Sequence, residues 1–113
     1  MNIDINASLI VSIVRKGWGS SVLQAAVKAG ARGGTVLLGR GMGVHEQEKI
    51  FGMAIEPEKE IVLTMVPEDQ VDAILGEIVR AADLDAAGHG MAFVLPVNKI
   101  VGITDSLTGA NAE

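Results

Sequence analysis

The chain of 113 residues contains no cysteine and no tyrosine, and aromatic residues make up only 3% of it. Without cysteine there can be no disulfide framework, no thiol nucleophile and no zinc site of the cysteine type. Few rings are available for stacking on nucleic acid bases, and the excess of 14 acidic over 9 basic residues repels a phosphate backbone. We therefore do not expect nucleic acid as a partner.

Long apolar runs are missing as well. No segment approaches the roughly 20 apolar residues needed to cross a bilayer, and the first residues, Met1 to Asp4, lack the basic and apolar regions of a secretion signal. We therefore expect a cytoplasmic protein. The length fits a single domain. Its 49% apolar content is high for so small a chain and predicts that apolar surface is buried between subunits.

What the sequence does contain is a pattern of apolar segments that occurs twice. A run rich in β-branched residues is followed by an apolar stripe at helical spacing and then by a second apolar run. The predicted strands are 9–14, 35–38, 61–66 and 91–95, and the predicted helices are 20–29 and 68–82. This order predicts an α+β, ferredoxin-like βαββαβ fold, in which a four-stranded antiparallel sheet carries two helices on one face. Its bare face would be apolar, which predicts a trimer formed through the sheets.

Several residues predict where these elements begin and end. Ser20 or Ser21 is expected to cap the first helix, and Gly30 is expected to follow it with a positive φ. Pro96 is expected to end the last strand, because proline cannot donate a hydrogen bond to a ladder. The glycine-rich and polar stretch from Gly39 to Pro57 predicts a long, protruding, irregular loop.

Three segments resemble the PII family of signalling proteins. Residues 29–36, followed by Arg40-Gly41-Met42-Gly43, are similar to the end of the family's first helix, its second strand and the entry to its T-loop. Residues 81–90 resemble the B-loop, and Phe93-Val94-Leu95-Pro96-Val97 resembles the last strand. The resemblance implies a PII-like domain at residues 1–104, with a T-loop at about 41–57 and a B-loop at about 83–90, before a flexible tail at 105–113.

PII proteins are trimers that bind ATP or ADP between subunits and act on partner proteins through the T-loop. The resemblance implies that this chain is a homotrimeric regulator and not an enzyme, with an adenine nucleotide (ADP, AMP or ATP) as effector and no obligatory cofactor. Its target is an unidentified protein, for which a membrane transporter is one class. The implied nucleotide-binding residues are Thr35, Arg40, Gly41, Met42, Gly43, Gly88, His89 and Gly90. The implied partner-docking residues are His45, Glu46, Gln47, Glu48 and Lys49.

Physical chemistry agrees with this implied site, because glycine turns let backbone N–H groups approach phosphate oxygens closely. The chain also departs from the family pattern. Met91, Gly102 and Thr104 stand where the family has cations, which predicts a preference for fewer phosphates than ATP carries. His45 replaces the glutamine used for magnesium and 2-oxoglutarate, and the lack of tyrosine excludes modification of a T-loop tyrosine.

Several of these residues also have less specific interpretations. His45, Glu46 and Glu48 match no metal-binding motif, so a solvated loop tip is favoured over a metal site. His89 fits a phosphate donor and a simple turn residue equally well. Trp18 is expected to pack at the start of the first helix rather than to dock a partner.

Two other functions stay open. One is a ferredoxin-fold phosphate-ester hydrolase, with His45 or His89 as base and Arg40 holding phosphate. The other is an oligomeric interaction module without a ligand. Saturable nucleotide binding without turnover distinguishes the PII-like regulator from both.

Overall fold

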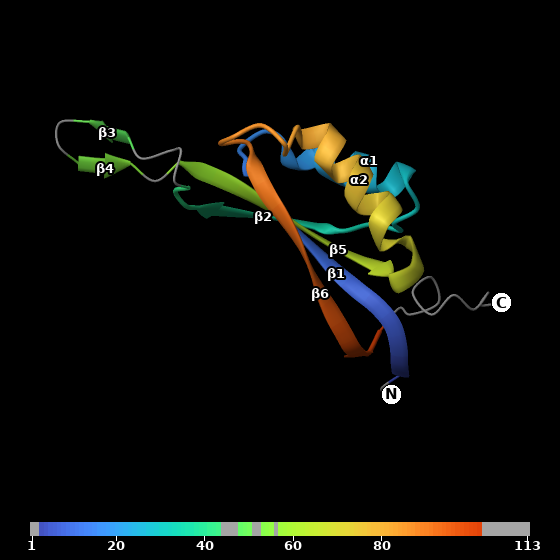
Figure 1. The fold of residues 1–113 in the computed structure, drawn as a ribbon. Helices are drawn as coiled ribbons and strands as arrows, with labels where there is room; N and C mark the ends of the chain where they lie inside the picture. Colours follow the sequence, from blue (N-terminus) through green and yellow to red (C-terminus); the bar gives the residue numbers. More distant parts are fainter. Residues whose placement is uncertain (1–2, 44–47, 51–52, 56, 103–113) are drawn as a thin grey trace.

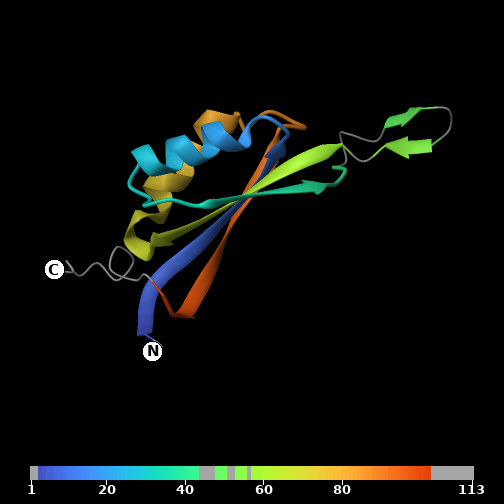
Figure 2. The same cartoon turned by 180° about the vertical axis from the view of Figure 1, so that it is seen from behind.

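The structure, a computed structural model, describes residues 3–43, 48–50, 53–55 and 57–102. Its elements in chain order are β1 (Ile3–Arg15), α1 (Gly19–Lys28), β2 (Thr35–Arg40), β3 (Glu48–Ile50), β4 (Met53–Ile55), β5 (Glu58–Pro67), the 3-10 turn η1 (Glu68–Gln70), α2 (Val71–Ala82) and β6 (Gly90–Ile100). The long strands form one four-stranded antiparallel sheet in the order β2-β5-β1-β6. Both helices cover the same face of this sheet (Figures 1 and 2), as predicted for a ferredoxin-like arrangement.

The core lies between the sheet and the two helices. Successive side chains of a strand point to opposite faces, so every second residue of β1 and β5 faces the helices. In α2, Ile74, Ile78 and Ala82 recur at helical spacing and are buried, which confirms the predicted stripe. The buried apolar cluster is Ile10, Val14, Val22, Ala26, Ala31, Val62, Val66, Ile74, Ile78 and Ala82. Within the described ranges, no helix is long and apolar enough to cross a membrane.

The opposite face of the sheet is apolar and uncovered in the described part of the chain. The cross-strand pairs Leu9–Leu95, Val11–Phe93 and Ile13–Met91 line it. The exposed fractions of Met91, Phe93 and Leu95 are 55%, 40% and 45%. A contiguous apolar surface of this kind marks an interaction site in a soluble protein.

The start of α1 differs from the prediction. The helix begins at Gly19, and Trp18, not a serine, occupies the N-cap position without a side-chain capping bond. The N–H of Gly19 instead donates to Oε1 of Glu60 at 2.7 Å. A carboxylate at this end of a helix also meets the positive end of the helix dipole. Local sequence patterns cannot reveal this acceptor, because it lies 41 residues away on β5. Gly30 follows the helix with a φ of 126°, as predicted.

The prediction that Pro96 ends the last strand was wrong. β6 continues to Ile100, and Pro96 lies opposite Ser8 of β1. Among the described strands β6 pairs only with β1, so it lies at the sheet edge, and an edge strand tolerates proline where its missing N–H would face away from the ladder. β1 also begins earlier than predicted, since Ile3 pairs with Ile100 beyond a register shift between Asp4 and Ala7.

The described part of the stretch from Gly39 to Pro57 is not irregular throughout. β2 extends to Arg40, and β3 and β4 pair as a separate antiparallel hairpin that projects beyond the sheet (Figure 1). Of the predicted docking residues, Glu48 and Lys49 lie in β3. His45, Glu46 and Gln47 lie outside the described residues, as do Thr104 and the tail at 105–113.

Candidate functional site

The first group of candidate residues lies at the base of the β3–β4 hairpin. Arg40 is the last residue of β2 and lies opposite Glu58 of β5. The N–H of Gly41 donates to the carbonyl oxygen of Pro57 at 3.1 Å, which closes the base of the predicted T-loop. Met42 is 43% exposed and Gly43 is exposed as well. Arg40 to Gly43 therefore form a continuous, accessible edge that leads into the hairpin.

The second group forms a compact turn between α2 and β6. Asp83 ends α2 in the left-handed conformation, with a φ of 51°. The N–H of His89 donates to the carbonyl oxygen of Ala86 at 3.3 Å, and Gly88 and Gly90 both have positive φ. The predicted B-loop is thus a glycine turn. His89 lies between two positions whose backbone conformation only glycine adopts easily.

The two groups lie at the same end of the sheet but on opposite edges. Gly90 is opposite Val14, Val14 is opposite Glu60, and Glu60 is opposite Leu38. Gly90 and Leu38 therefore share one row across three strand spacings, about 14 Å in all. Arg40 and Gly41 continue β2 beyond this row. Within one chain the B-loop glycines and the T-loop base do not come together.

Thr35 is further removed. It begins β2, opposite Leu63, so the length of β2 separates it from Arg40. Thr35 is exposed on the outer edge of the sheet. The predicted adenine contact therefore shares an edge with the T-loop base, while the predicted phosphate contacts of the B-loop occupy the other edge.

Two cations that sequence reasoning did not select lie between these edges. Arg15 of β1 and Lys59 of β5 are direct cross-strand partners. Lys59 is only 6% exposed, and alternation along β5 places it on the uncovered side of the sheet with Ile61 and Leu63. Like charges directly opposite each other on neighbouring strands are unfavourable. The sequence did contain a sign of Lys59. It occupies the same alternating positions of its strand as the apolar residues Ile61 and Leu63.

A stack of side chains joins the end of β1 to the B-loop. The Arg15 guanidinium carbon lies 5.0 Å from the centroid of the Trp18 ring. The Trp18 and His89 rings have centroids 6.1 Å apart, at an interplanar angle of 47°. Trp18 also packs against the apolar core, so its expected structural role is confirmed. It has in addition a direct contact with a candidate site residue.

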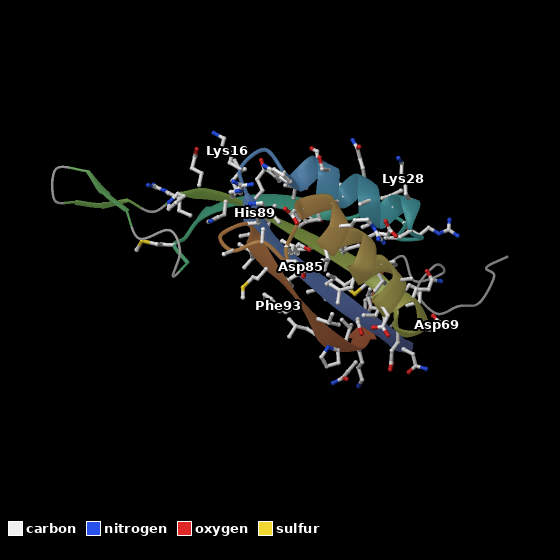
Figure 3. The ribbon with its side chains drawn as sticks, turned by 45° about the horizontal axis from the view of Figure 1, so that its top comes forward. Lys16, Lys28, Asp69, Asp85, His89 and Phe93 are labelled. Atoms are coloured by element: carbon white, nitrogen blue, oxygen red, sulfur yellow. The ribbon has the colours of Figure 1, made fainter. Side chains whose placement is uncertain are left out.

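An exposed ion pair lies beside this stack. Nζ of Lys16 is 2.9 Å from Oε1 of Glu58, and this hydrogen bond raises the pKa of Lys16 and lowers the pKa of Glu58. Figure 3 shows Lys16 and His89 at the same end of the molecule, with Asp69 at the other end. Water screens a pair of this kind, so it contributes little to the stability of the fold.

The chemistry available at this end of the sheet is that of anion binding. Backbone N–H groups of the glycine turns, Arg15, Arg40 and Lys59 are all suited to oxygen anions. No group of three or more histidine, aspartate or glutamate side chains suited to a metal ion occurs among the residues that the structure describes. The candidate residues are thus divided between the two edges of the sheet.

Comparison with known proteins identifies the family of the chain. The family model for nitrogen regulatory protein P-II matches residues 7–106. Among solved structures, Arabidopsis thaliana PII bound to citrate superposes with a TM-score of 0.70 at 29% sequence identity, covering 97% of this chain and 94% of that chain. No curated protein sequence matches. The family match spans nearly all of the described sheet and both helices, and we conclude that the chain belongs to the nitrogen regulatory protein P-II family, whose members are oligomeric regulatory proteins that bind effectors and partner proteins.

Proposed function

We propose that the chain forms a homotrimer that binds an adenine nucleotide in the clefts between subunits and regulates a target protein through its T-loop. The observation that carries the proposal is the division of the candidate residues between β2 and the B-loop, at opposite edges of one sheet. Each edge holds half of a site, and the facing edge of a neighbouring subunit would supply the other half. Cyclic symmetry repeats such a contact at every interface.

The uncovered apolar face supports the assembly. Met91, Phe93 and Leu95 expose large side chains on it in the single chain. Burial of apolar surface stabilises by about 25 cal/mol per Å², so packing the sheets of neighbouring subunits against one another would remove the unfavourable contact with water. The same packing would bring the edges of neighbouring sheets close together.

In the proposed cleft, Thr35 meets the adenine, and Arg40 with the B-loop N–H groups meets the phosphates. Met91 directly follows Gly90 at the position where the family has a cation. One charge pair at 4 Å is worth about 4 kcal/mol at an effective dielectric of 20, before desolvation removes most of it. The missing cation therefore weakens binding of ATP more than binding of ADP or AMP.

Calorimetric titration of the purified protein with AMP, ADP and ATP, without added metal, tests the proposal. We expect saturable binding without phosphate release, with ADP or AMP bound at least as tightly as ATP. A tenfold preference of the wild-type protein for ATP would contradict the charge argument, and turnover of the nucleotide would favour the hydrolase alternative.

A carboxylate anion is a second candidate effector. Arabidopsis PII has been solved with citrate bound, and Arg15, whose buried Nε has no hydrogen-bond partner among the described residues, lies at the hairpin end of the sheet in this chain. Titration with citrate and with a dicarboxylate, in the wild type and in Arg15→Gln, tests this ligand class. Equal binding by both proteins would exclude Arg15 from the site.

The target of the T-loop is a protein, and a membrane transporter is one proposed class. The projecting β3–β4 hairpin supports a docking role, because it pairs with no strand of the four-stranded sheet. Its position beside Arg40 and Gly41 would let nucleotide occupancy influence its orientation. Capture of targets in the presence and absence of ADP, compared with a protein lacking residues 44–56, tests this part of the proposal.

A further inference from the structure

The turn that joins β1 to α1 lies between the two loops that the proposed function uses. In the sheet, β1 has β5 on one side and β6 on the other, and both run antiparallel to it. The predicted T-loop leads into β5 and the B-loop leads into β6. The end of β1 therefore meets the beginnings of both strands. The turn that follows, Lys16-Gly17-Trp18-Gly19, has contacts on both sides.

Hydrogen bonds make this turn a single unit. The N–H of Trp18 donates to the carbonyl oxygen of Arg15 at 3.1 Å. Gly17, the third residue of the turn, has a φ of 94°, as a type II turn requires. The carbonyl oxygen of Trp18 accepts from the N–H of Val22 at 3.1 Å, in the first turn of α1. Because the turn is closed and joined to the helix, its residues are expected to move together.

On the side of β6 the turn contacts the B-loop. The rings of Trp18 and His89 have centroids 6.1 Å apart, within the range of aromatic pairs. Trp18 also packs against the core, and the guanidinium of Arg15 lies over its ring. Figure 3 shows His89 and Lys16, the first residue of 16–19, at the same end of the molecule. A shift of the B-loop therefore changes the packing of Trp18.

On the side of β5 the turn is bonded to two residues that follow the T-loop. Nζ of Lys16 lies 2.9 Å from Oε1 of Glu58, and the N–H of Gly19 donates to Oε1 of Glu60 at 2.7 Å. Glu58 directly follows Pro57, whose carbonyl oxygen accepts the bond that closes the T-loop base. The exposed ion pair is weak, so the partly buried bond of Gly19 is the stronger connection.

We propose that the turn at residues 16–19 couples the B-loop to the base of the T-loop within one subunit. A change at either loop moves the turn and, through its bonds to β5 or its contact with His89, affects the other loop. This inference deepens the proposed regulatory function, because the two loops lie on opposite edges of the sheet. Coupling between two sites is reciprocal, so it can be tested from either side. Both tests use the protein without nucleotide.

The first test perturbs the B-loop side and measures opening of the T-loop base. The protein is digested with an arginine-specific protease, and the products are identified by mass spectrometry. Cleavage after Arg40 reports opening of the T-loop base, because the rate follows the population of the open form. We expect Trp18→Leu to raise this rate about fivefold, the lower end for coupled sites, and Trp18→Phe to stay near the wild type.

The matched control is Leu75→Ala, which loosens the core from α2 and leaves the turn intact. Equal acceleration after Arg40 by Leu75→Ala would show that general loss of stability is the cause. Acceleration after Arg15 alone would show that the effect of Trp18→Leu stays local. Either result overturns the coupling.

The second test perturbs the T-loop base and measures the turn. Trp18 is the only tryptophan, so the fluorescence of the chain reports on the turn directly. Gly41→Pro removes the N–H that bonds to Pro57, whereas Gly41→Ala keeps it and has open space for its Cβ. We expect acrylamide to quench Trp18 about twofold more strongly in Gly41→Pro than in the wild type, and equally in Gly41→Ala.

Unchanged quenching in Gly41→Pro, or the same increase in Gly41→Ala, overturns the coupling whether or not the protein binds ADP. The nucleotide proposal is decided separately by the calorimetric titration of the wild type. Absence of ADP binding there, together with the expected cleavage and quenching, overturns the nucleotide site and leaves the coupling supported.

Discussion

At the scale of single residues, two glutamates on β5 make different interactions. One caps a helix at a partly buried position, and the other forms an exposed ion pair. Glu60 accepts a hydrogen bond from the Gly19 N–H at a partly buried position, and Glu58 pairs with Lys16 at an exposed one. Loss of a helix N-terminal acceptor costs about 0.5–2 kcal/mol. We therefore expect Glu60→Ala to lower the free energy of unfolding by about 1 kcal/mol in urea titration. Glu58→Ala is the control and should unfold at nearly the same urea concentration as the wild type. Equal effects of the two substitutions would contradict the cap.

The pH dependence of the Lys16–Glu58 pair has a defined sign. The pKa of Glu58 is lowered by its hydrogen bond to Lys16, so the stability it contributes is present above the ordinary glutamate range and is lost as the pH falls through the lowered value. The pKa of Lys16 is raised, so its contribution is lost only as the pH rises through the raised value. We expect the small difference in stability between the wild type and Glu58→Gln to vanish in acid and at high salt. A difference that grows in acid would contradict this sign.

Gly90 is the residue at which the B-loop meets the sheet most closely. Its φ is 133°, and a Cβ at this position would overlap the carbonyl oxygen of Ile13. The strained backbone costs about 1–3 kcal/mol, and overpacking adds a similar amount. We expect Gly90→Ala to lower the free energy of unfolding by at least about 2 kcal/mol. Gly41→Ala has open space around its Cβ and should leave stability unchanged. The two variants can be compared by thermal unfolding, and equal midpoints would show that the B-loop can move away from Ile13.

At the scale of elements, the periodicity of the sequence predicted which residues are buried. It failed for features that depend on contacts with neighbouring elements. The stripe through Ile74, Ile78 and Ala82 and the runs that became β1 and β5 carry their burial pattern in the sequence itself. Whether Pro96 ends a strand depends on the position of β6 at the sheet edge, and the cap of α1 depends on Glu60, which is distant in sequence. The β3–β4 hairpin was hidden because its strands are only three residues each.

Only part of the candidate site could be predicted from the sequence. The glycine turns at Gly41 to Gly43 and Gly88 to Gly90 were visible as motifs, and the structure places them at one end of the sheet. Their separation onto two edges follows from the strand order, which no local pattern encodes. The contact of Trp18 with His89 was not predictable either, because the two residues are more than half the chain apart in sequence.

The T-loop hairpin is expected to fold independently of the sheet. β3 pairs only with β4, and the Gly41–Pro57 hydrogen bond closes the sheet below it. Replacement of residues 44–56 by a short glycine-serine turn should therefore shift the thermal midpoint by less than about 3 °C and should leave nucleotide binding measurable. Loss of cooperative unfolding in this variant would show that the hairpin is part of the folding unit.

At the scale of the whole molecule, the apolar sheet face makes a prediction about assembly. Phe93 on this face and Val27 on α1 have similar exposed fractions, 40% and 45%. A charge buried between sheets without a partner is strongly unfavourable, whereas a charge on the helical face stays in water. Sedimentation at micromolar concentration should give a trimer for the wild type and for Val27→Glu, and smaller species for Phe93→Glu. A monomeric wild type, or dissociation by Val27→Glu alone, would contradict assembly through the sheets.

The pairing of Ile3 with Ile100 places the described ends of the chain side by side, and Figure 1 shows them far from the β3–β4 hairpin. A fluorescent reporter or a surface anchor fused ahead of β1 would therefore stand at the opposite pole from the T-loop. In a cyclic assembly all such attachments would emerge on one side, away from every hairpin. The protein could then be immobilised for binding measurements, or followed in a cell, with its docking loops left accessible to their target.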